Sequence, residues 1–206
     1  MKLFYSNFYG TLTVFANFFI LNILWVITCL PIITFFPATS AMFSVIRRWK
    51  LKGDSGVLFL YIKYFKENFK QSFIIGTIWV IFSVILYFDF LFIRQFEFRV
   101  FLLVPLLFIA LLFIFTTIYL FSTISHYNAS IKVIIKSSFL VSMAYFPMTI
   151  LNLILLALIL VILYYFPIMS LILFSFAAFV NFSVCHKVFL KNGRLNEKKT
   201  IQQNIE

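Results

Sequence analysis

Few residues in this 206-residue chain carry the side chains that catalysis or metal binding requires: two His, two Cys and six Asp or Glu. His126 and His186 lie at the ends of predicted apolar segments, so they could approach each other with Cys185 to bind a metal. The carboxylates that would complete such a site, Asp89 and Glu97, are expected at the opposite ends of those segments. We therefore predict no metal site, no cofactor and no catalytic residue, and we expect a protein that is not an enzyme.

Four asparagines lie inside apolar segments: Asn17, Asn22, Asn152 and Asn181. An amide in lipid needs a hydrogen-bond partner, and a neighbouring helix is the ordinary one, at a gain of about 0.6 to 2 kcal/mol. Packing contacts are therefore the favoured interpretation, and a polar path for a substrate is the alternative. No Asp, Glu, Lys or Arg lies near the middle of these segments, although proton- and ion-coupled carriers commonly keep one there. This argues against a secondary transporter.

Positive charge gathers between residues 37 and 70. Each cation near anionic lipid contributes about 1 kcal/mol, so the plain interpretation is that this segment sets the topology. The second interpretation is a docking surface for a cytoplasmic or membrane partner. Its candidate residues are Arg47, Arg48, Lys50, Lys63, Lys66 and Lys70. The net charge of +11 predicts an anionic lipid bilayer as partner and not a nucleic acid, because the cations flank apolar segments.

Part of this basic segment has the periodicity of an amphipathic helix. Four apolar residues recur at helical spacing: Leu58, Ile62, Phe65 and Phe69. The charged residues fall on the opposite stripe: Lys63, Lys66, Glu67 and Lys70. The pattern predicts a helix that lies at a membrane interface.

The whole composition is that of an all-α, polytopic membrane protein. Hydrophobic residues make up 64% of the chain and charged residues 11%, which is too little polar surface for a water-soluble domain. Runs long enough to cross a bilayer predict five transmembrane helices, with a kink near Pro147. They cover residues 11–36, 72–93, 101–124, 139–164 and 167–189. We expect one membrane domain over residues 1–206, with a cytoplasmic basic segment at 37–70 and a cytoplasmic tail at 190–206.

The distribution of Lys and Arg predicts the orientation. One set of helix ends holds fourteen of these cations: Arg47, Arg48, Lys50, Lys52, Lys63, Lys66, Lys70, Lys132, Lys136, Lys187, Lys191, Arg194, Lys198 and Lys199. The other set holds Lys2, Arg94 and Arg99. By the positive-inside rule the first set is cytoplasmic, so the N-terminus is expected outside and the C-terminus inside.

Two parts of the chain share a spacing that suggests an internal repeat. Lys66, Lys70, Ser72 and Phe73 match Lys132, Lys136, Ser138 and Phe139. Each group leads into an apolar helix that ends in an aromatic cluster, at residues 84–88 and 161–166. The pattern suggests a parallel repeat of two helical hairpins, each preceded by a basic segment.

Two stretches resemble the YesL family of bacterial membrane proteins, also described as the domain of unknown function DUF624. They are NILWVITCLPIITFFPATSAMFSVIRRW at residues 22–49 and YFKENFKQS at residues 64–72. The resemblance includes the Leu24–Trp25 pair, the Leu30–Pro31 pair and the small residues from Ala38 to Ala41. It implies a bacterial cytoplasmic membrane protein associated with carbohydrate uptake, and it supplies no site residues to carry over.

Two functions follow as hypotheses. The first is a non-enzymatic accessory or scaffold protein that works beside a membrane transporter component, as the resemblance implies. The alternative is a small-solute transporter or channel built from the two hairpins around a polar cavity that Asn152 or Asn181 reaches. The sequence predicts no oligomeric state.

Overall fold

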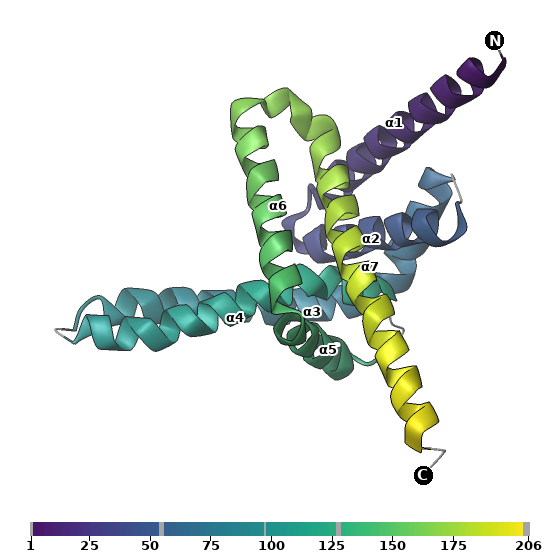
Figure 1. Cartoon of the computed structure of the whole chain (residues 1–206). Helices are drawn as coiled ribbons and strands as arrows, with labels where there is room; N and C mark the ends of the chain where they lie inside the picture. Colours follow the sequence, from purple (N-terminus) through teal and green to yellow (C-terminus); the bar gives the residue numbers. More distant parts are fainter. Residues whose placement is uncertain (1, 54–55, 97, 127–128, 204–206) are drawn as a thin grey trace.

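The computed structural model describes the backbone of residues 2–53, 56–96, 98–126 and 129–203, and the side chains within these ranges from residue 12 to residue 191. This part of the chain is helical and contains no strand, which confirms the expected all-α class (Figure 1). The α-helices are α1 (Lys2–Cys29), α2 (Phe35–Lys52), α3 (Val57–Ile93), α4 (Arg99–His126), α5 (Ile131–Ala144), α6 (Phe146–Tyr165) and α7 (Ser170–Gln203). Two 3₁₀ turns, η1 (Ile32–Thr34) and η2 (Pro167–Met169), join α1 to α2 and α6 to α7.

Five helical stretches within the described residues are long and apolar enough to cross a membrane. They are Leu12–Cys29, Val57–Ile93, Arg99–His126, Phe146–Tyr165 and Pro167–Lys191. The expected number of spans is therefore confirmed, and the chain is a multi-pass membrane protein.

The bounds of two spans differ from the prediction. The first apolar run does not continue to Phe36, because α1 ends at Cys29 and the chain turns at Pro31. The predicted run 139–164 is interrupted at Tyr145, whose φ of −116° and ψ of 45° are not helical. Pro147, near the start of α6, lacks the N–H that a continuous helix would need, so the chain begins a new helix there.

The amphipathic stretch at 58–70 forms the first part of α3 and not a separate helix. Its apolar stripe remains exposed at Leu58 and Ile62, while the adjacent face at Leu60 and Tyr61 is buried. An exposed apolar stripe is what a helix at a lipid interface presents. Helical phase therefore separates the side chains that face lipid from those that face the protein.

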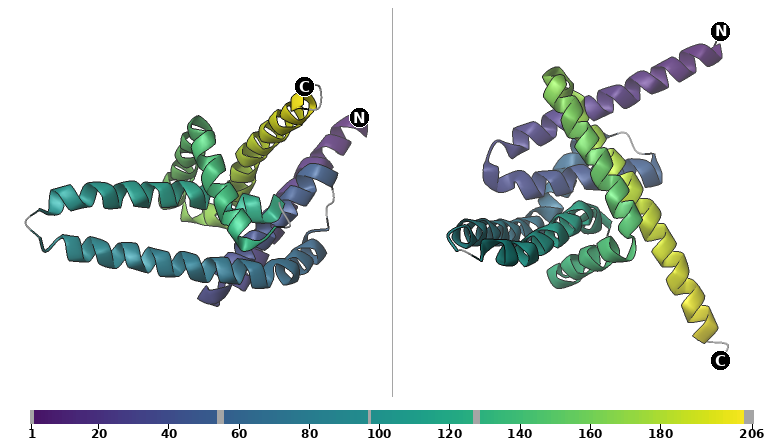
Figure 2. Two further views of the ribbon diagram at one scale, coloured as in Figure 1. Left: turned by 90° about the horizontal axis from the view of Figure 1, so that it is seen from below. Right: turned by 60° about the vertical axis from the view of Figure 1, so that its left-hand side comes forward.

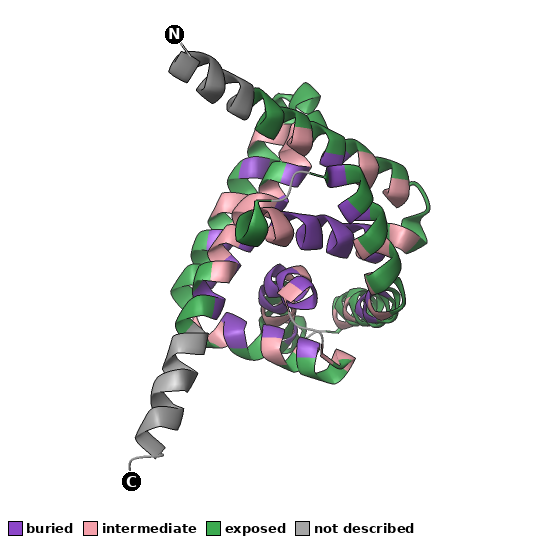
Figure 3. Cartoon of the chain, turned by 90° about the vertical axis from the view of Figure 1, so that its right-hand side faces the viewer, coloured by how far each residue is buried: buried purple, intermediate pink, exposed green. Residues whose placement is uncertain are grey.

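The centre of the molecule is α2, as the buried stretch in Figure 3 shows. Every residue from Pro37 to Ile46 is buried, and α2 packs against α1, α3, α4 and α7. Ala38, Ser40 and Ala41 have small side chains that let neighbouring helices approach closely. The first part of the predicted basic segment is thus an internal helix. Its charged end stops at Gly53, where φ is 67° and the N–H donates to the Trp49 carbonyl at 2.9 Å.

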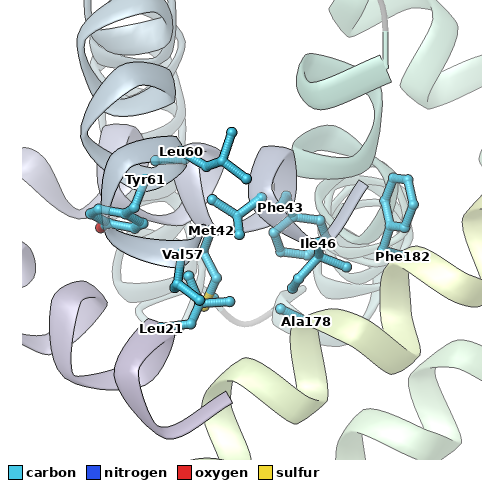
Figure 4. Packing of buried hydrophobic residues seen from close by; sticks show 11 residues of the cluster. Leu21, Met42, Phe43, Ile46, Val57, Leu60, Tyr61, Ala178 and Phe182 are labelled. Atoms are coloured by element: carbon cyan, nitrogen blue, oxygen red, sulfur yellow. The ribbon is translucent and has the colours of Figure 1, made fainter. Parts of the chain in front are cut away.

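The main apolar cluster surrounds α2. It joins Leu21 of α1, Met42 and Ile46 of α2, Val57 of α3 and Phe182 of α7 (Figure 4). Residues of α1, α2, α3 and α7 thus share one apolar core.

Two hairpins extend from this centre in different directions, α3 with α4 and α6 with α7 (Figures 1 and 2). The first part of the proposed repeat also has a common burial register. Ser72, Ile75 and Gly76 of α3 are buried, and so are the residues 66 positions later: Ser138, Val141 and Ser142. The first group lies in the hairpin helix α3, whereas the second lies in α5, before the α6–α7 hairpin, so the internal repeat stays a prediction.

Candidate functional site

A cavity of about 300 Å³ lies where the basic end of α2 meets α3 and the end of α4. Its lining is mostly polar, with Ser44, Arg47, Arg48, Leu51 and Lys52 from α2, Tyr64, Glu67 and Asn68 from α3, and Ile124 and Ser125 from α4. Three cations therefore line it together with one carboxylate. Such a charge balance suits an anionic ligand.

Arg47 is half-buried because it follows directly on the buried part of α2. Its Nη1 donates a hydrogen bond to the Ser125 carbonyl of α4 at 2.7 Å. Its buried Nε has no acceptor among the residues that the structure describes. Burying an N–H donor without an acceptor costs free energy. The partly buried Arg47 guanidinium can therefore accommodate a further hydrogen-bond acceptor.

Hydroxyl and amide contacts hold α2 against α3 beside the cavity. Asn68 Nδ2 donates to Ser44 Oγ at 3.0 Å, and Ser72 Oγ donates to Ser40 Oγ at 2.8 Å. All of these contacts are buried or partly buried, so they fix the register of the two helices. Asn68 and Ser44 both line the cavity, and their contact fixes one wall of it.

The six candidate docking residues have different surroundings in the structure. Arg47 and Arg48 line the cavity. Lys63 Nζ lies 4.0 Å from the Glu67 carboxylate, with both side chains about half exposed, so this pair contributes at most about 1 kcal/mol. Lys66 and Lys70 are exposed on α3. The side chains of the predicted basic cluster thus point in different directions, because each helix has its own rotation about its axis.

Lys50 lies in a different place, over the ring of Phe179 of α7 with Nζ 5.8 Å from the ring centroid. Burial, and secondarily the charge of Lys187, lower the pKa of Lys50 below the ordinary lysine value. Lys50 and Asn17 line the same groove of about 440 Å³, together with Phe18 of α1. Asn17, predicted to make an intramembrane contact, is therefore half-buried at the side of this groove.

The other three asparagines join helices. Asn22 Nδ2 donates to the Ser170 carbonyl at 2.6 Å and so ties α1 to the start of α7. Asn181 Oδ1 accepts from Ser122 Oγ at 3.2 Å, which connects α7 to α4. Asn152 Nδ2 approaches Cys185 Sγ at 3.7 Å, between α6 and α7. These are the interhelical contacts that the packing interpretation predicts.

The structure brings the two histidines together at the ends of α4 and α7. The ring centroids of His126 and His186 are 6.3 Å apart. Cys185 is buried and its Sγ donates to Asn181 Oδ1 at 3.4 Å. Within residues 12–191, as far as their side chains are described, no three His, Cys, Asp or Glu residues come together in a way that could hold a metal ion.

Only Arg47 and Arg48 of the ten cavity-lining residues were among the predicted site residues. The other eight are Ser44, Leu51, Lys52, Tyr64, Glu67, Asn68, Ile124 and Ser125. Lys52 and Tyr64 stand in the basic segment, where the sequence indicated topology and interface position but not a shared cavity. Ser125 is 78 positions from Arg47 in the chain, so no local pattern connects them. The predicted cations Lys2, Arg194, Lys198 and Lys199 lie outside the described side chains.

Residues 18–90 match a family model described as a protein of unknown function, DUF624. Over these residues the chain is similar to the DUF624 family. It is similar to the uncharacterized protein YesL of Bacillus subtilis (strain 168), with 32% identity over 126 residues, which cover 59% of this chain and 60% of YesL. The uncharacterized protein YteU of the same organism is 27% identical over 177 residues, or 82% of this chain and 79% of YteU. No solved structure matches.

The region matched to the DUF624 model contains every α2 and α3 residue that lines the cavity. It also contains the contact between Asn68 and Ser44. The candidate site therefore lies mainly within the part of the chain that matches the family model, and α4 completes it.

Proposed function

We propose that this chain is a non-enzymatic accessory or scaffold protein of the bacterial cytoplasmic membrane. The observation that carries the proposal is the divergence of the two hairpins, α3–α4 and α6–α7, from a shared base (Figure 2). Helices of a self-contained membrane bundle pack along one another over most of their length. Hairpins that diverge leave long helix faces uncovered by this chain, and helices of another protein can pack there.

The faces of both hairpins support this proposal. In the outer half of α4, Phe101 and Leu107 are highly exposed, at 83% and 60%. In α6, Leu160 is 64% exposed. Lipid can cover such side chains at no cost, and so can the apolar helices of a partner, because the two environments are equally apolar. The proposed partner is accordingly a membrane protein, and a transporter component is the candidate from the family resemblance.

The contacts of the intramembrane asparagines favour this function over a transporter or channel. Asn181 is bonded to Ser122 and Cys185, and Asn152 approaches Cys185. A substrate path would need their amides free to face a polar cavity. Here Asn181 Oδ1 accepts from Ser122 of α4 and Asn152 Nδ2 approaches Cys185 of α7, so these two groups serve the packing of the hairpin bases.

The proposed orientation places the basic helix ends on the cytoplasmic side by the positive-inside rule, with the C-terminus inside and the N-terminus outside. In this arrangement Arg47, Lys66 and Lys70 lie at the cytoplasmic leaflet, where anionic lipid attracts them. Nucleic acid is not a proposed partner. The association with carbohydrate uptake comes from the family resemblance, and identification of the partner tests it.

Site-directed photocrosslinking in native membranes tests the scaffold proposal. A photoreactive residue is placed at Leu107 of α4 or Leu160 of α6, with Ile32 at the turn between α1 and α2 as the matched exposed control, at 88% exposure. We expect the hairpin positions to give an adduct with a transporter subunit or another membrane protein, and the Ile32 position to give much less of it. Adducts with lipid or with a second copy of this chain alone would contradict the proposal.

A further inference from the structure

We infer that the cavity between α2, α3 and α4 binds the phosphate group of an anionic ligand. This inference rests on the cavity alone and does not depend on the proposed scaffold function. The cavity is walled by three helices and has cationic, hydroxyl and amide groups on its lining. It is therefore a formed site and not a scattered set of surface charges.

Arg47 is the cation of the cavity for which an anion would supply a missing hydrogen-bond acceptor. The Arg47 guanidinium is held in place by its 2.7 Å bond to the Ser125 carbonyl, while its buried Nε has no acceptor among the described residues. Lys52, which is exposed, adds positive charge within the same lining. Guanidinium groups bind phosphate oxygens through charge-assisted hydrogen bonds, which are about twice as strong as neutral ones.

The single carboxylate of the lining does not cancel this charge. Glu67 lies 4.0 Å from Lys63, one turn earlier on α3, and about half of its side chain is exposed. Its charge is therefore shared with a cation outside the cavity. The oxygens of a phosphate group can accept hydrogen bonds from Arg47 and Lys52, both in a monoester dianion and in the monoanionic phosphodiester of a phospholipid.

The size of the cavity limits the ligand. At about 300 Å³ it is at the lower end of the range for small-molecule sites, roughly 300 to 1,000 Å³. It has room for a phosphate and a small organic group such as glycerol, with Leu51 and Ile124 as apolar neighbours. The ligand is thus either the headgroup of an anionic phospholipid or a free phosphate ester of similar size.

Binding measurements on the purified full chain separate these two sources. One arm titrates glycerol 3-phosphate and inorganic phosphate against the protein in a neutral detergent and follows the heat of binding. The other arm reconstitutes the protein in phosphatidylcholine vesicles, with or without phosphatidylglycerol, and measures the rise in its thermal unfolding midpoint. Saturable binding in the first arm assigns a free phosphate ester, and a midpoint rise in the second arm assigns a lipid headgroup.

Charge-removing variants localise the effect. Lys52→Gln changes an exposed residue that lines the cavity, and Arg47→Gln removes the buried guanidinium. The matched controls are Lys66→Gln and Lys70→Gln, which remove the same charge from exposed positions of α3 outside the cavity. We expect each cavity variant to weaken binding about tenfold, or to abolish the corresponding midpoint rise, and each control to change it less than about twofold.

Three results would overturn the inference. The first is the absence of binding in both arms, and the second is an equal loss in the cavity and control variants. The third is full retention of binding by Lys52→Gln, whether or not Arg47→Gln folds. Lys52→Gln keeps the test decisive if Arg47→Gln fails to fold, because Lys52 is exposed and its loss leaves the bond between Arg47 and Ser125 in place.

Discussion

Gly76 of α3 packs directly on Phe36 of α2. A Cβ atom built on Gly76 would lie 2.6 Å from Phe36 Cγ and 2.9 Å from Phe36 Cβ. The second of these atoms is fixed by the backbone of α2, so a rotation of the ring cannot relieve the clash. The absence of a side chain at Gly76 is thus what lets α2 approach α3 at this point.

Gly76→Ala should therefore destabilise the protein by about 1 to 3 kcal/mol, through overpacking at this contact. The measurement is reversible unfolding in mixed micelles with increasing denaturing detergent. Gly56→Ala is the matched control, because a Cβ there meets no atom within 4 Å. A partial rescue by Phe36→Leu in the Gly76→Ala background is expected, and equal destabilisation by the two glycine variants would refute the contact.

The hydroxyl pair of Ser40 and Ser72 should show coupling in a double-mutant cycle. Their Oγ atoms are 2.8 Å apart and both side chains are buried. We expect the coupling between Ser40→Ala and Ser72→Ala to be about 0.6 to 2 kcal/mol in the free energy of unfolding. Ser83, which bonds within its own helix to the Trp79 carbonyl, is the control for loss of a hydroxyl without loss of an interhelical contact.

Asn181→Leu should loosen the base of the second hairpin. The change removes the acceptor of Ser122 Oγ and Cys185 Sγ, which connects α7 to α4. We expect a loss of about 1 to 2 kcal/mol in the free energy of unfolding. The reagent accessibility of Cys185 gives a second measurement, since this buried thiol should react faster in the variant. Unchanged stability and an unreactive thiol would show that the contact does not hold the hairpin.

The pKa of Lys50 should rise towards the ordinary lysine value in Lys187→Gln, because the charge of Lys187 is one of the two causes that lower it. The larger cause, burial, remains, so the return should be partial. Between the lowered folded-state pKa and the ordinary unfolded-state value, unfolding takes up a proton, and the free energy of unfolding should therefore rise with pH across that window.

The pH profile of amine labelling at Lys50, resolved by peptide mass spectrometry, measures this shift. Lys70→Gln, on the exposed face of α3, is the control variant. A Lys50 profile that moves equally in both variants would rule out a specific effect of Lys187.

Reporter fusions should find the C-terminus in the cytoplasm and the N-terminus outside. Five spans would place the two ends on opposite sides, and the positive-inside rule predicts that the cation-rich helix ends are the cytoplasmic set. Alkaline phosphatase and green fluorescent protein fused at each end distinguish the compartments. Both ends in one compartment would refute this topology and, with it, the proposed cytoplasmic position of the basic ends.

The number of membrane helices could be read from the chain because hydropathy and charge act locally. A run such as residues 101–124 must be helical in lipid whatever its neighbours are, since only a helix satisfies its own backbone. The small residues from Ala38 to Ala41 and the lone Gly76 also indicate where helices can approach closely. These local signals give the class of protein and the pieces of its fold.

Local sequence patterns did not predict which helix each side chain of the basic segment contacts. Arg47 and Lys50 are three positions apart, yet one reaches the Ser125 carbonyl of α4 and the other lies over Phe179 of α7. The helix that each side chain contacts depends on the rotation of α2 about its axis. The packing of all the helices around α2 sets that rotation. The approach of His126 to His186, 60 positions apart, has the same origin.

By itself, the sequence determined that this chain is a helical membrane protein with five apolar helices and a strongly basic set of helix ends. Each of these properties depends on the hydropathy or charge of residues that are neighbours in the sequence. The tertiary structure alone decided that α2 is central, that the hairpins part, and that Arg47, Lys52, Asn68 and Ser125 surround one cavity. These properties depend on contacts between distant segments, which close packing fixes and no local pattern records.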